Sequence, residues 1–108
     1  MADFTIRQND TAPIFTYSLV KPDGTVPNLT GATIQFEMRE QIVGNRFVSG
    51  SAAIVGSPTL GQVSYTWQPT DTNQAGNYNA LFLVTFADGT EESFPNDHFL
   101  IVQVTKSL

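Results

Sequence analysis

The residue with the greatest catalytic potential is His98, the only histidine of the chain. An imidazole can act as a general base for a nucleophilic hydroxyl when a carboxylate orients it. The carboxylates considered as partners are Asp71 and Asp97, but no Gly-x-Ser-x-Gly sequence supplies a nucleophile. A single histidine excludes sites that need two imidazoles, and a chain without cysteine has no thiol catalysis, zinc ribbon or disulfide. We therefore expect the protein not to be an enzyme.

Acidic residues could act as metal ligands or as a pair of catalytic carboxylates. Asp97 and His98 are neighbours in the sequence, so on a strand they would point to opposite faces and could not chelate one ion. Asp88, Glu91 and Glu92 surround a turn and could bind calcium weakly, but the segment lacks the ligand spacing of a calcium loop. A solvated hairpin tip is the favoured interpretation. We predict no metal site and no cofactor.

The charge balance argues against nucleic acid as a partner. The 108 residues include ten acidic and five basic side chains, which gives a net charge of −5. Nucleic-acid binding depends on clustered Lys and Arg that neutralise phosphates, whereas the basic residues here are scattered. Charged residues make up only 14% of the chain and aromatic residues 11%, which favours a folded core over a disordered coil. The length fits one domain spanning residues 1–108.

The sequence shows no targeting or membrane-spanning segment. Its first residues lack a basic stretch followed by an apolar one, so no signal peptide is predicted. The longest apolar cluster, residues 80–87, is far shorter than a bilayer span. We expect no contact with a membrane and synthesis in a cytoplasm.

The elements that position these side chains are predicted to be β-strands, because apolar and polar residues alternate with a period of two. The segments with this pattern are 3–8, 14–20, 32–39, 62–68, 77–86, 90–94 and 98–104. The weaker middle, residues 47–55, predicts one or two short edge strands beside a mobile loop near Gly44 and Asn45. With turn residues about every 8–12 positions, the pattern predicts an all-β, immunoglobulin-like antiparallel β-sandwich of roughly seven to nine strands without a disulfide. A single barrel is the alternative, because local patterns cannot distinguish the two.

One local motif has the spacing of a tyrosine corner, in which the chain passes from one sheet to the other. Asp71 is followed by four residues and then by Gly76-Asn77-Tyr78. We expect the Tyr78 hydroxyl to bond to the upstream backbone, Asp71 to accept loop amides, and Gly76 to permit a close approach or a positive φ. Ala80 stands where an antibody domain has its second cysteine, so packing alone must hold the core.

The last long strands carry apolar residues on both faces, although a sandwich strand needs only one apolar face. The second face carries Leu81 and Leu83 in one strand, and Phe99 and Ile101 in the other. We predict that these four residues form a surface for self-association or for docking to a partner protein. The alternative is that a loop or the middle segment covers them.

A different class of function is a carbohydrate- or cell-surface-binding module, in which exposed aromatic rings stack on sugars. Tyr65 and Trp67 would form that platform. They share one side of their strand with Val63, so a place in the core is the favoured interpretation.

The order of the motifs along the chain resembles a known family. The segments that carry the resemblance are FTIRQNDTAP (4–13), GATIQFEMR (31–39), GQVSYTW (61–67), the corner (71–78), FADGT (86–90) and FP (94–95). Together they resemble the immunoglobulin-like N-terminal domain of tailed-phage baseplate upper proteins and related small phage structural proteins. The resemblance implies a non-enzymatic virion component of the tail, baseplate or head, which contacts other virion proteins or copies of itself and is made in a bacterial host. Baseplate upper proteins continue into long helical parts after this domain, so we expect an accessory or decoration protein or an excised domain.

Overall fold

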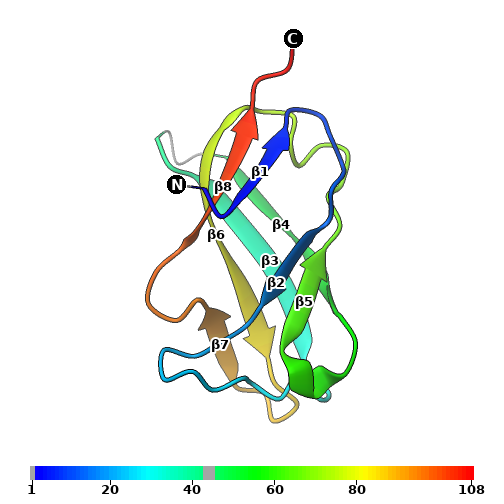
Figure 1. Ribbon diagram of the computed structural model, residues 1–108, viewed down its shortest axis with the longest axis vertical. Helices are drawn as coiled ribbons and strands as arrows, with labels where there is room; N and C mark the ends of the chain where they lie inside the picture. Colours follow the sequence, from blue (N-terminus) through cyan, green and yellow to red (C-terminus); the bar gives the residue numbers. More distant parts are fainter. Residues whose placement is uncertain (1, 43–45) are drawn as a thin grey trace.

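The computed structural model describes residues 2–42 and 46–108, so the predicted loop at Gly44 and Asn45 lies outside the described residues. In the described part the protein has eight β-strands and one short 3₁₀ helix (Figure 1). They are, in chain order, β1 (Phe4–Arg7), β2 (Phe15–Ser18), β3 (Thr33–Glu40), β4 (Phe47–Ile54), η1 (Pro58–Leu60), β5 (Gln62–Tyr65), β6 (Gly76–Thr85), β7 (Glu91–Phe94) and β8 (Leu100–Thr105). The predicted all-β class is confirmed. No helix among these residues is long and apolar enough to cross a membrane.

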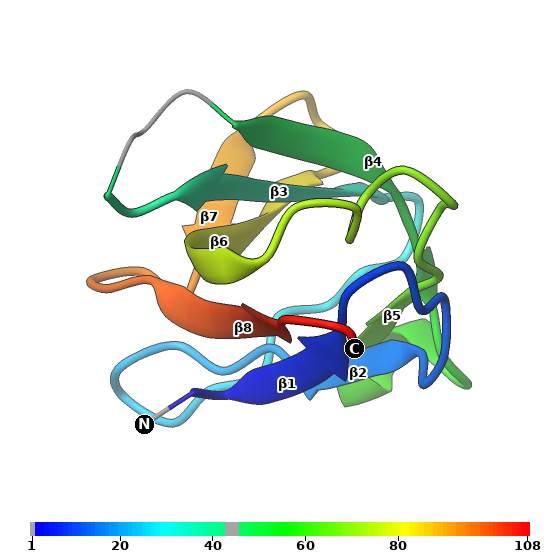
Figure 2. The ribbon, with the colours of Figure 1, turned by 90° about the horizontal axis from the view of Figure 1, so that it is seen from above.

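The strands follow one hydrogen-bonded path in the order β1-β8-β6-β3-β4-β5-β2. β3 occupies one edge of β6, while the other edge pairs with β8 at residues 76–80 and with β7 at residues 82–85. The larger layer is formed by β1, β8, β6, β7, β3 and most of β4. β2 and β5 lie across from it, and the end of β4 crosses over to pair with β5 (Figure 2). The path curls around the core and has no ladder between β1 and β2 in the described residues, so the arrangement approaches a barrel.

The sheet is mixed, whereas the sequence predicted antiparallel pairing throughout. β1 runs parallel to β8, with Phe4 beside Val102 and Arg7 beside Thr105. Alternation of apolar residues shows which face of a strand is buried but says nothing about the direction of its neighbour. The parallel pair therefore could not be inferred from the pattern of either segment.

The alternating positions that were predicted to point inward form the core. In β3 these are Ile34, Phe36 and Met38, all at most 5% exposed. Phe36 lies at the centre of an aromatic cluster, with its ring centroid 4.4 Å from that of Tyr65 and 5.3 Å from that of Phe82. The other rings of this cluster belong to Phe4, Phe15, Tyr17 and Trp67. Packing of these rings from both layers takes the place of a disulfide.

The middle of the chain forms one strand of eight residues, which is longer than the one or two short edge strands that the sequence predicted. β4 pairs with β3 from Phe47 to Ala52 and with β5 at Ala53 and Ile54. Gly50 does not interrupt it, because the Tyr65 side chain packs against this glycine. A Cβ atom at position 50 would lie 2.8 Å from the Tyr65 hydroxyl oxygen. Glycine inside a strand here marks a close approach of another side chain and not a strand end.

Candidate functional site

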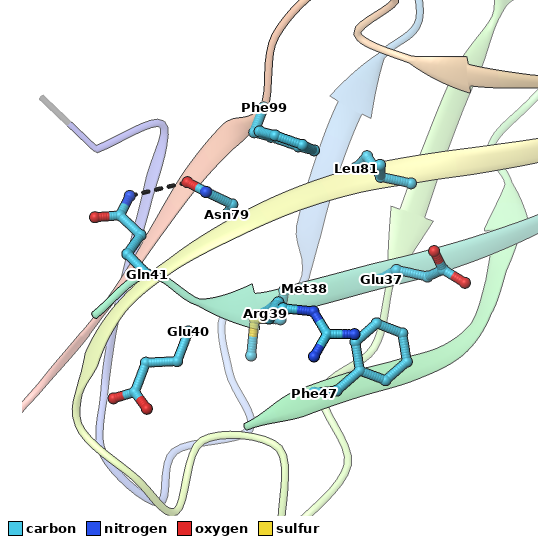
Figure 3. Close-up of a pocket in the computed structure, with 9 residues that line it drawn as sticks. All are labelled: Glu37, Met38, Arg39, Glu40, Gln41, Phe47, Asn79, Leu81 and Phe99. Carbon is cyan, nitrogen blue, oxygen red and sulfur yellow. Dashed lines mark hydrogen bonds between the residues drawn. The ribbon is translucent and has the colours of Figure 1, made fainter. Parts of the chain in front are cut away.

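A groove of about 420 Å³ lies on the outer face of the larger layer (Figure 3). Its apolar walls are Phe47 from β4, Leu81 from β6 and Phe99 from the segment before β8. Strand register brings these distant residues together. Arg39 of β3 pairs with Phe47 on one side and with Asn79 on the other. Two residues earlier on β3, Glu37 pairs with Leu81.

The two aromatic walls of the groove are open to solvent. Phe99 is 52% exposed and Phe47 is 47% exposed. Leu81 is half-buried, and it lies where β6 changes partner, since β8 pairs as far as Ala80 and β7 begins at Phe82. The break between β7 and β8 therefore leaves the outer side of Leu81 beside Phe99 (Figure 3).

Polar groups surround these apolar walls and are held in place by contacts with their neighbours. The Arg39 guanidinium carbon lies 4.8 Å from the centre of the Phe47 ring, in a cation–π contact. Gln41 Nε2 donates a hydrogen bond of 3.0 Å to Asn79 Oδ1 (Figure 3). An apolar centre with a polar rim is the anatomy of a protein–protein interface.

Of the four residues that the sequence assigned to a docking surface, two line the groove. Leu81 and Phe99 share the groove, whereas Ile101 lines a separate hollow with Gln103. Leu83 lies further along β6, between Gln35 of β3 and Ser93 of β7. Leu81, Leu83 and Ile101 are half-buried.

Sequence reasoning missed Phe47, the second open wall of the groove. Its segment was interpreted as a short edge strand, so its pairing with Arg39 was not foreseen. Extending the alternation from Phe47 through Ser49, Ser51 and Ala53 would have placed it on an exposed face.

The corner residues form a compact hydrogen-bonded unit at the entry to β6. The Tyr78 hydroxyl donates to the Gln74 carbonyl oxygen at 2.8 Å, which is the bond that defines a tyrosine corner. Gly76 has φ +154°, a conformation unfavourable for other residues, and a Cβ atom there would lie 2.9 Å from a Glu40 carboxylate oxygen. Arg46 donates to the Thr70 carbonyl oxygen on the same turn. Burial is the main cause that raises the pKa of Tyr78.

Asp71 is only 7% exposed, and its carboxylate joins the corner to the core. One carboxylate oxygen accepts the backbone N–H of Gln68 at 2.8 Å and the Tyr65 hydroxyl at 2.5 Å. Burial, then the hydrogen bond to Asp71 and its charge, raise the pKa of Tyr65 well above its ordinary value of 10.0. These bonds account for Asp71 as a structural residue.

Asp97 and His98 contact one another, contrary to the prediction that they diverge. Asp97 Oδ1 and His98 Nδ1 are 2.7 Å apart. The prediction assumed a strand, but β8 begins only at Leu100 and the pair lies on the preceding bend. Both side chains are largely exposed, at 70% and 64%, and the hydrogen bond from His98 lowers the pKa of Asp97. Asp71 bonds to Tyr65 and Gln68, and no contact between it and His98 is seen among the described residues.

The acids at the β6–β7 turn make local hydrogen bonds. Asp88 accepts bonds from both the backbone N–H and the hydroxyl of Thr90, which lower the pKa of Asp88. Glu92 accepts from Asn96 and forms an ion pair of 3.7 Å with Lys21. Within residues 2–42 and 46–108, no group of three or more His, Asp or Glu side chains is arranged to hold a metal ion.

The aromatic pair considered for sugar stacking lies in the core. Tyr65 is 1% exposed and Trp67 is 2% exposed, and their rings meet edge to face at 5.2 Å. A stacking platform must present a ring face to solvent, so these two residues cannot supply it.

No family model matches the chain, and no curated protein matches its sequence.

Proposed function

We propose that the protein is a non-enzymatic structural component of a bacteriophage particle, in the tail, baseplate or head, and that it acts through contacts with other virion proteins. The observation that carries this proposal is the groove between Phe47, Leu81 and Phe99. Exposed aromatic side chains beside a hollow are the groups that dominate the energy of protein–protein interfaces once a partner removes them from water.

Within the all-β class, we propose more specifically that the fold is an immunoglobulin-like sandwich. Three features support it: the tyrosine corner at Tyr78, the β2–β5 pair opposite the larger layer, and the parallel placement of β1 beside β8. The order of sequence motifs that resembles phage structural proteins points to the same fold. Such a scaffold holds two walls of the groove, Phe47 and Leu81, on strands, where register sets their positions, while Phe99 directly precedes β8.

The rim of the groove favours a partner with both apolar and polar contact groups. Glu37 and Arg39 lie next to one another on β3 and present opposite charges, so a large patch of one sign is not needed on the partner. The net charge of −5 speaks against the phage genome as that partner.

The proposal is tested by locating the chain in particles. Virions from a culture that expresses the gene are purified on a density gradient, analysed by mass spectrometry and labelled with gold-conjugated antibodies against the chain. We expect the chain to sediment with the particles and the gold to mark one structural region at a regular number of copies. A chain that remains with unassembled protein, and is lost from particles after the gradient, contradicts the proposal.

A further inference from the structure

One hydrogen-bonding edge of β4 is open over most of its length, because the described chain pairs with it only at its Ala53 end. Glu40 N donates to Arg46 O, and Val55 N donates to Gln62 O, on opposite sides of this strand. Because backbone groups alternate between the two edges of an antiparallel strand, the even positions from 46 to 52 face β3 and the odd positions face away from it. β5 takes up the outward groups only at Ala53.

The outward backbone groups of three residues, Phe47, Ser49 and Ser51, are therefore left without a backbone partner within the described residues. Each contributes one N–H and one C=O. Figure 2 shows β4 at the margin of the larger layer, with β3 beside it and no strand beyond it along this stretch. All three side chains are exposed on the outer sheet face.

Proteins protect exposed strand edges with charges, prolines or bulges, because a bare edge is a template for another strand. β4 lacks charges and prolines, because its sequence, FVSGSAAI, contains no charged residue and no proline. Its pairing with β3 continues without a bulge from Phe47 to Ala52. The edge is thus open to pairing with another chain.

We propose that β4 pairs with β4 of a second copy of this protein, antiparallel and about a two-fold axis at Ser49. This register sets Phe47 opposite Ser51 of the partner copy and Ser49 opposite its own equivalent. All three residues are then in hydrogen-bonded positions, so every outward N–H and C=O of the stretch finds a partner. The same segment serves both chains, as a two-fold interface requires.

The charge distribution permits this pairing although each copy has a net charge of −5. The acid nearest to the axis is Glu37, which stands beside Ser49 on β3. The two Glu37 residues would be separated by three strand spacings, about 14 Å. That separation exceeds the Debye length of about 8 Å at physiological ionic strength, so their repulsion is screened.

The dimer rests on edge hydrogen bonds and a small contact area, so it is expected to be weak and to depend on protein concentration. This self-association shares only Phe47 with the groove, whose other walls, Leu81 and Phe99, lie on β6 and before β8. A copy held by β4 leaves that part of the groove open to a different partner.

The direct test is amide hydrogen exchange of the whole protein, measured by NMR at about 20 µM and about 1 mM. We expect the amides of Phe47, Ser49 and Ser51 to exchange at least tenfold more slowly at the higher concentration. Amides of Val48 and Gly50, which face β3, should be protected at both concentrations. Fast exchange of the three outward amides at 1 mM, or slow exchange already at 20 µM, overturns the proposal.

A second test compares the dimer dissociation constants of two variants that each gain one positive charge. Ser49→Lys would place two ammonium groups opposite one another at the axis, where like charges repel. Thr5→Lys adds the same charge at an exposed position of the edge strand β1. By sedimentation equilibrium, Ser49→Lys should raise the dimer dissociation constant at least tenfold while Thr5→Lys leaves it within twofold. Circular dichroism establishes that both variants are folded, and a dimer that survives Ser49→Lys unchanged contradicts the proposal.

Discussion

Replacing Phe36 with alanine is expected to destabilise the protein by about 3–5 kcal/mol, the largest effect of any single change considered. Phe36 is fully buried and its ring contacts rings from both layers, those of Phe15, Tyr65, Trp67 and Phe82. Alanine would remove most of the apolar side chain and leave a cavity that β3, held between β4 and β6, cannot close. The loss corresponds to a fall in Tm of roughly 12–20 °C at about 4 °C per kcal/mol.

The matched control is Phe47→Ala on the neighbouring strand. Phe47 is 47% exposed, so the same truncation should cost less than about 1 kcal/mol. Urea unfolding followed by tryptophan fluorescence measures both variants, because Trp67 is the only tryptophan of the chain and is buried. Equal losses of stability in the two variants would show that the layers do not meet at Phe36.

Removal of the Asp71 carboxylate is expected to cost about 3 kcal/mol. Asp71→Ala leaves the buried Tyr65 hydroxyl and the Gln68 backbone N–H without their acceptor. Hydrogen bonds to a charged group are worth roughly 1.5–3 kcal/mol, and an unsatisfied buried donor adds its own desolvation cost. The corner would then lose its link to the aromatic core.

A double-mutant cycle separates this link from a general loss of packing. Tyr65→Phe removes only the hydroxyl group. In a protein that carries this change, Asp71→Ala no longer leaves a buried Tyr65 hydroxyl without its acceptor. The two changes together should therefore cost less than the sum of the single changes, by at least about 1 kcal/mol. Strict additivity within error would mean that the Tyr65–Asp71 bond contributes nothing.

The pH dependence of the same pair has a defined sign. The pKa of Tyr65 is higher in the folded protein than its ordinary value of 10.0, so the unfolded chain releases this proton first as the pH rises. The folded state then binds more protons than the unfolded state, and stability falls as the pH increases above about 10. Tyr17 and Tyr78, whose pKa values are also raised, add to this fall in every variant. Stability curves of the wild type and of Tyr65→Phe should therefore converge at alkaline pH.

Much of the fold could be predicted from local alternation, because a strand with one buried face imposes a period of two on its own residues. Ile34, Phe36 and Met38 were placed on the buried side in this way, and they lie in the core. The alternation of apolar and polar residues does not indicate which strands become neighbours. The parallel placement of β1 beside β8 and the continuity of β4 depend on contacts with distant segments, as the packing of Tyr65 on Gly50 shows.

The candidate site was predictable only in part for the same reason. Leu81 and Phe99 were recognised as outward-facing apolar residues, and both line the groove. The pattern could not show that the groove includes Leu81 and Phe99 but not Leu83 or Ile101, since this depends on where along β6 the pairing changes from β8 to β7. Phe47 entered the site only through its register with Arg39.

The proposed attachment of the protein to a phage particle through the groove is measured most directly by the incorporation of groove variants. Tagged wild type, Phe99→Asp and the control Leu60→Asp are each produced during infection, and the tag is quantified in purified particles. Leu60 is 55% exposed, comparable to Phe99 at 52%, but lies on η1 outside the groove. We predict that the wild type and Leu60→Asp are incorporated equally and that Phe99→Asp is reduced at least tenfold while its thermal stability is unchanged. Equal incorporation of folded Phe99→Asp would contradict attachment through the groove.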